Sequence, residues 1–71
     1  MSEPVLTELR KLTDIATDMD LAANLRKDAI KSMGLIGTHE ALLALLDLVA
    51  NAKLNPNERK LALQQAEKLI K

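Results

Sequence analysis

Few side chains in this sequence could carry out chemistry. His39 is the only histidine and is followed by Glu40, and the chain has no cysteine to complete a metal site. No serine or aspartate stands at a spacing from His39 that indicates a nucleophile with its base. Gly34 and Gly37 are too few and wrongly placed for a phosphate-binding loop. The sequence therefore predicts a protein that is not an enzyme and that uses no metal or cofactor.

Basic side chains are the remaining candidates. Arg26 and Arg59 occupy matching positions, where a guanidinium either holds neighbouring hairpins together, which we favour, or contacts a partner directly. The lysines either form basic stripes on the second and fourth helices that contact a partner or simply keep the surface solvated. The candidate partner-binding residues are Arg26, Lys27, Lys31, Arg59, Lys60 and Lys68.

Charge and composition exclude several classes of function. The chain has 71 residues, with ten basic and ten acidic side chains, so it lacks the field of a general nucleic-acid or membrane binder. It has no aromatic residue to stack on bases. No apolar run approaches the roughly 18 residues that span a bilayer, and the N-terminus lacks a secretory pattern. We expect a cytoplasmic protein that contacts no membrane and for which nucleic acid is a less favoured partner than protein.

The elements that position these side chains are predicted to be helices, because the apolar residues are mostly Leu, Ala, Ile, Val and Met. One helix is expected over about residues 3–17, capped by Ser2, and a second over about residues 21–36, ending at Gly37 in the left-handed conformation. Their predicted inward-facing residues are Val5, Leu9, Leu12, Ala16, Leu25, Ala29, Ile30, Met33 and Ile36, with Leu6 and Ile15 beside them.

Two more helices are predicted in the second half. Thr38 is expected to cap a very apolar helix over about residues 39–52, which must be covered on several sides. Asn55 is expected to form a capping box with Glu58 and to begin a fourth helix that ends near residue 70. An extra apolar stripe on the third helix is expected to be buried against the first hairpin; if it is exposed, it predicts a homodimer. That stripe consists of Leu43, Leu46 and Ala50.

The two halves of the chain resemble each other at a spacing of 33 residues. The string Asn-x-Arg-Lys-x-Ala occurs at residues 24–29 and again at residues 57–62, and further matches hold Leu9 with Leu42 and Leu12 with Leu45. One hairpin cannot bury its apolar stripe alone, so a second is expected to stack on it. We predict one domain over residues 1–71, with repeat one at 3–36 and repeat two at 38–71. An ordinary four-helix bundle without a repeat is the alternative.

Residues 25–49 include Met33-Gly34, Ile36-Gly37, Ala41-Leu42 and Leu45-Leu46. In this order they resemble the junction between HEAT-like helical repeats of the type found in phycobilisome-lyase-related proteins. The resemblance resumes at Arg59, Ala62, Ala66 and Leu69 and covers most of the chain. It implies hairpins stacked into a solenoid, a scaffold or adaptor role, a structural arginine and a mildly basic concave groove. Members of that family normally carry more repeats than the two found here.

The expected fold is all-α, with two stacked antiparallel helical hairpins that form either a HEAT-like solenoid fragment or a compact four-helix array. The expected function is a non-catalytic protein–protein interaction module or adaptor, whose partner is another protein or a second copy of the chain. The alternative is a small regulatory protein that binds nucleic acid or another acidic partner through a basic helix face.

Overall fold

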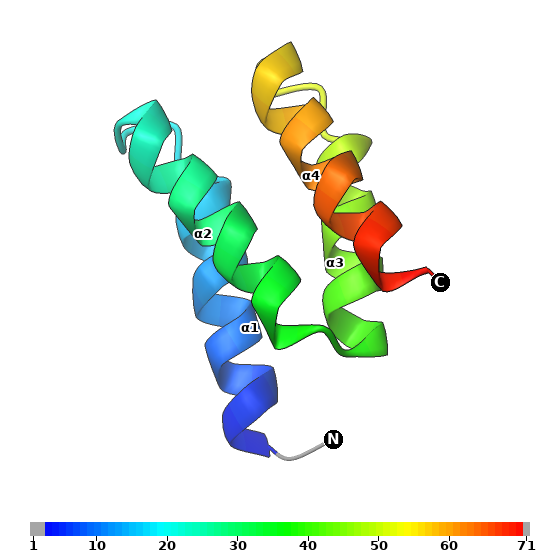
Figure 1. Ribbon diagram of the computed structural model, residues 1–71. Helices are drawn as coiled ribbons and strands as arrows, with labels where there is room; N and C mark the ends of the chain where they lie inside the picture. Colours follow the sequence, from blue (N-terminus) through cyan, green and yellow to red (C-terminus); the bar gives the residue numbers. More distant parts are fainter. Residues whose placement is uncertain (1–2, 71) are drawn as a thin grey trace.

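Four α-helices make up the fold. The computed structural model describes residues 3–70, without the side chain of Glu3. The helices are α1 (Glu3–Ala16), α2 (Ala23–Ile36), α3 (His39–Val49) and α4 (Pro56–Leu69). Figure 1 shows α1 and α2 as one antiparallel hairpin beside a second hairpin made of α3 and α4. The predicted all-α class and the four-helix array are confirmed.

The helix ends follow the capping residues of the sequence. The Thr38 hydroxyl accepts a hydrogen bond from the Ala41 amide at 3.2 Å. The Asn55 side chain accepts from the Glu58 amide at 2.9 Å, and Glu58 accepts in return from the Asn55 amide at 3.4 Å, so the predicted capping box is present. Gly37 ends α2 with φ of 67°, as predicted. The predicted cap at Ser2 lies outside the described residues.

Three predicted boundaries were wrong by one to three residues, and two of them have a side-chain cause. α1 ends at Ala16 instead of residue 17. α2 begins at Ala23 instead of residue 21, because the Asp18 carboxylate accepts from the Asp20 amide at 2.9 Å and holds a turn there. α3 ends at Val49 instead of residue 52, because the Asn51 side chain accepts from the Lys53 amide in the same way.

The helices form two layers that are packed unequally. α2 packs against α1, α3 and α4, whereas α1 and α3 make little contact with each other. In Figure 1, α2 and α4 form the front layer and α1 and α3 the rear layer. The radius of gyration of 11.0 Å matches the value of about 11 Å expected for a compact chain of this length. The core residues are Leu9, Ala16, Ala29, Ile30, Met33, Ala41, Leu45, Leu48, Leu54, Ala62 and Ala66.

Some residues predicted to face inward are exposed. Leu25 is 47% exposed, although the periodicity of α2 placed it in the core. Leu43, Leu46 and Ala50 are exposed on α3, so the expectation that they pack against the first hairpin was wrong. The physical reason is that α3 has neighbours on one side only, where Ala41, Leu45 and Leu48 are buried.

Three of the four pairs of helix boundaries repeat the 33-residue spacing of the sequence, whereas the starts of α1 and α3, at Glu3 and His39, are 36 residues apart. α1 and α3 end at Ala16 and Val49, and α2 and α4 span Ala23–Ile36 and Pro56–Leu69, each pair offset by the same interval. Positions that match in sequence therefore stand at matching places in the two hairpins.

In the described part of the chain, no helix is long and apolar enough to cross a membrane.

Candidate functional site

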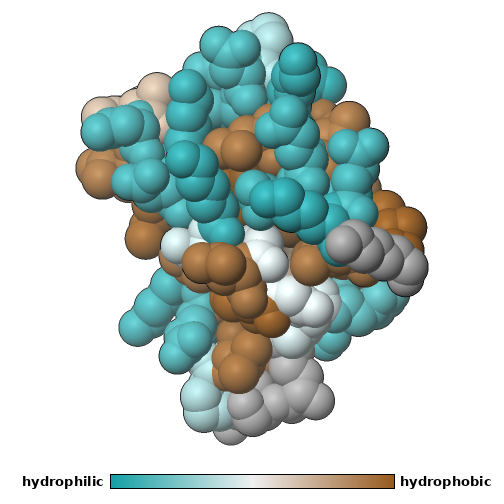
Figure 2. Space-filling model, in the orientation of Figure 1, coloured by the Kyte–Doolittle hydropathy of each residue, from teal (hydrophilic) through white to brown (hydrophobic). Residues whose placement is uncertain are grey.

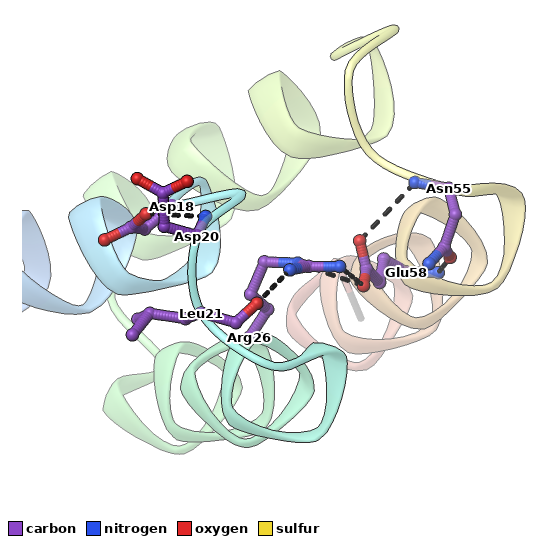
Figure 3. Close-up of polar contacts among 6 residues, drawn as sticks. All are labelled: Asp18, Asp20, Leu21, Arg26, Asn55 and Glu58. Atoms are coloured by element: carbon purple, nitrogen blue, oxygen red, sulfur yellow. Dashed lines mark hydrogen bonds and ion pairs between the residues drawn. The ribbon is translucent and has the colours of Figure 1, made fainter.

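An ion pair between Arg26 and Glu58 joins the two hairpins. The Nε and Nη2 atoms of Arg26 donate to Oε2 of Glu58 at 3.1 and 2.8 Å. Figure 3 shows Arg26 reaching from α2 to Glu58 at the start of α4, with Asn55 beside it. The Arg26 side chain is 10% exposed and that of Glu58 is fully buried, so the pair is shielded from water. Contacts of this kind are charge-assisted and stronger than neutral hydrogen bonds.

The local sequence provides for the remaining polar atoms of this pair. Nη1 of Arg26 donates to the carbonyl oxygen of Leu21, which the Asp18 turn brings next to the first turn of α2. The second oxygen of Glu58 accepts from the Asn55 amide. Among the described residues, no buried side-chain nitrogen or oxygen lacks a partner. Arg26 is therefore held inside the chain and is not placed to meet a partner.

Arg59 stands at the matching position of the second hairpin but has different surroundings. Its Nε donates to the carbonyl oxygen of Val49 at 2.7 Å, and its side chain is partly exposed. No carboxylate of the described side chains forms an ion pair with it. Arg59 thus carries an unneutralised charge at the surface where Arg26 carries a neutralised one inside.

The candidate lysines lie on the layer formed by α2 and α4. Lys31, Lys60 and Lys68 are exposed, and Lys27 is half-buried beside Arg26. Figure 2 shows mostly hydrophilic side chains over the upper part of this layer, with apolar side chains gathered near the end of α2. Asp28 and Glu67 are exposed on the same two helices. The layer therefore carries charges of both signs.

Two open grooves lie on other parts of the surface. One, of about 310 Å³, separates α1 from α3 and is lined by Leu6, Leu9, Arg10, Thr13, Asp14 and Ala44. It exists because the rear helices diverge while α2 and α4 stay in contact. The other, of about 280 Å³, lies on the second hairpin and is lined by Val49, Pro56, Arg59, Lys60 and Leu63. Arg59 and Lys60 are thus brought together, whereas Lys31 and Lys68 line neither groove.

The residues considered for catalysis are not assembled into a site. His39 is exposed at the first position of α3, and Glu40 is half-buried behind it. Within residues 3–70, no group of three His, Cys, Asp or Glu side chains could hold a metal ion. What the described residues do form is two open grooves and the internal ion pair between Arg26 and Glu58.

The sequence reasoning missed the role of Glu58. It identified this residue as half of a capping box but not as the partner of Arg26. A signal was available, because Glu58 stands at the repeat position of Leu25, where a charge replaces an apolar residue. The groove between α1 and α3 was also missed, since divergence between helices leaves no mark on periodicity.

Comparisons of the chain with protein-family models, with curated proteins and with solved structures each found no match.

Proposed function

We propose that this chain is a non-catalytic protein–protein interaction module or adaptor of the cytoplasm, built from two HEAT-like hairpins. The observation that carries the proposal is that a large apolar side chain is exposed beside each of two open grooves. Leu6 is 40% exposed at one groove and Leu63 is 40% exposed at the other, while Leu43 is 50% exposed on the rear layer. Concave sites with apolar side chains at their edge are typical of binding sites.

The test is a comparison of surface variants of the full chain as bait in an extract of its source. Leu6→Asp, Leu43→Asp and Leu63→Asp each place a charge at a groove or on the rear layer. Leu35→Asp is the matched control, because Leu35 is 87% exposed and lines neither groove. We expect a bound protein that survives in Leu35→Asp and is lost in at least one of the other three. Binding that is equal in all four variants would contradict the proposal.

A second copy of the chain is one partner that the exposed face of α3 supports. Leu43, Leu46 and Ala50 form an apolar stripe that two copies could share across a twofold axis. Sedimentation velocity over a concentration series tests this proposal. A dimer that Leu43→Asp disrupts supports it, and a monomer at all concentrations excludes it.

The alternative function, binding of nucleic acid or another acidic partner, is favoured by the exposure of Lys31, Lys60 and Lys68 on one layer. Binding to phosphates weakens steeply as salt rises, because counterions are released. We would titrate the chain with duplex DNA at low and high salt, using Lys31→Glu/Lys60→Glu/Lys68→Glu as the control. If the wild-type chain does not bind at low salt, nucleic-acid binding is excluded.

A further inference from the structure

The second hairpin ends in a surface whose counterpart on the first hairpin is partly covered by the second hairpin. We call it the second-hairpin end face; it consists of Val49, Pro56, Arg59, Lys60 and Leu63. The repeat partners of Val49 and Leu63 are Ala16 and Ile30, and both of those are 0% exposed. Leu63 itself is 40% exposed, and an open groove lies beside it. The two positions are therefore buried in the first hairpin, whereas in the second Val49 is half-buried and Leu63 is exposed.

The first hairpin shows what kind of element covers such a surface. There, α4 packs against α2. Glu58, in the first turn of α4, accepts the two hydrogen bonds that Nε and Nη2 of Arg26 donate. One and two turns further along α4, Ala62 and Ala66 are 0% exposed. The covering element is a helix with a carboxylate in its first turn, followed by small apolar residues at four-residue spacing.

Arg59 gives the end face a charge requirement. If a helix covered this face without a carboxylate, the Arg59 guanidinium would be removed from water with only the Val49 carbonyl as a partner. Burying an unpaired charge is costly, whereas the same charge beside a carboxylate is compensated. Lys60 lines the same groove and adds to the positive charge. A covering helix must therefore be acidic at its N-terminal end.

A second wild-type copy does not meet this requirement. In head-to-tail stacking, the first hairpin of one copy would cover the second-hairpin end face of the next. The residue at the repeat position of Glu58 is Leu25, which is 47% exposed and has no charge to offer Arg59. The matching apolar contact is available, because Ile15, the counterpart of the buried Leu48, is 39% exposed. The carboxylate is missing, and Met33, which is buried, stands at the repeat position of the small Ala66.

We infer that the second-hairpin end face docks a helix of another protein, one that carries Glu or Asp in its first turn and small apolar residues one and two turns later. The carboxylate pairs with Arg59 as Glu58 pairs with Arg26, and the small residues pack on Leu63 and Val49. This inference rests on the proposed interaction function and specifies one partner chemistry for it.

Substitution of Leu25 by Glu makes the chain a probe of the charge requirement, because it supplies a carboxylate at the repeat position of Glu58. Sedimentation equilibrium would be compared for the wild-type chain, Leu25→Glu and the neutral control Leu25→Gln. We expect Leu25→Glu to associate at least about tenfold more tightly than Leu25→Gln. Adding Arg59→Met to Leu25→Glu is expected to return the affinity to that of the glutamine control. Leu25 is exposed, so these chains should fold, and circular dichroism checks that they do. If Leu25→Glu does not fold, Leu25→Asp takes its place.

Three results would overturn the inference: equal association of the Glu and Gln variants, association of Leu25→Glu that does not depend on Arg59, or Arg59-dependent association of the wild-type chain as tight as that of Leu25→Glu. Any of them leaves the proposed interaction function intact at the groove between α1 and α3. Conversely, the surface-variant experiment could capture no protein at all. That result would not alter the association of Leu25→Glu, which is measured on the chain alone. The two proposals therefore fail separately.

Discussion

Breaking the Arg26–Glu58 pair should destabilise the fold more than any other single change at a polar residue. Both side chains are nearly or fully buried, and two hydrogen bonds of 3.1 and 2.8 Å join them. Removing one partner of such a pair leaves the other charge buried and unpaired, which costs about 3–5 kcal/mol. A chain of 71 residues has a total stability of roughly 4–10 kcal/mol. Arg26→Met or Glu58→Met should therefore remove a third or more of the free energy of unfolding.

The double variant Arg26→Met/Glu58→Met distinguishes a charge effect from lost packing. It removes both charges and puts unbranched apolar side chains in the same space, an exchange that is often nearly neutral. We expect it to lose less stability than either single variant, which corresponds to a coupling energy of at least about 3 kcal/mol. Glu58→Gln is a useful companion, because it keeps an acceptor for the Asn55 amide while removing the charge.

The assay is urea unfolding followed by far-UV circular dichroism, since the chain has no aromatic residue for fluorescence. The stability differences should be the same at about 0.1 M and about 1 M salt, because salt screens buried pairs little. Losses below about 1 kcal/mol in both single variants would mean that the pair is exposed to water in solution. Additive losses in the double variant would refute the coupling between the hairpins.

Three further predictions concern the backbone and the caps. Gly37 has φ of 67°, so Gly37→Ala should lower the free energy of unfolding by about 1 kcal/mol and Tm by about 4–8 °C. Gly37→Asn should cost less. Equal losses in the two variants would contradict this reasoning. A Cβ at Gly34 would lie 2.1 Å from Oε1 and 3.2 Å from Cβ of Gln65, so Gly34→Ala should be more favourable, by about 0.5–1 kcal/mol, in a Gln65→Ala background, which removes the amide and keeps the Cβ contact. The same effect in both backgrounds would show that the two helices do not meet there. Asn55→Ala should cost about 1 kcal/mol and Asn55→Asp much less; both are measured by thermal unfolding, and no difference between them would argue against the cap.

Local features of this fold could be read from the sequence, whereas the fit between the hairpins could not. Capping residues act on atoms within three positions, so the Asn55–Glu58 box and the Thr38 cap were predicted correctly. Periodicity correctly placed Ile30 and Met33 in the core. Periodicity gave the wrong prediction at Leu25, because the face of α2 that carries Leu25 has no neighbouring helix there. An apolar pattern shows which residues are apolar but not which of them another element covers.

The candidate site also combines a feature that the sequence predicted with one that it did not. The repeat identified Arg26 and Arg59 as equivalent residues. The sequence offered two roles for them, holding the hairpins together or contacting a partner, and did not show that the two residues differ. The structure separates them, because only Arg26 has the second hairpin in front of it. Which of two equivalent residues is internal depends on the order of the hairpins, and the missing clue was the Glu58 that stands where the first repeat has Leu25.

Leu25 also bears on why a repeat of this kind need not polymerise. Two hairpins with matching ends form a head-to-tail contact, and such contacts build open filaments unless something opposes them. On the proposed end face, the chain keeps the apolar part of that contact in Ile15, Val49 and Leu63 but lacks the carboxylate at position 25. Placing the sole matching carboxylate at Glu58 directs it to Arg26 within the same chain. The differences between the repeats, Glu58 for Leu25 and Ala66 for Met33, thus favour internal stacking over stacking between copies, and on the proposed end face they leave Arg59 for a different acidic helix.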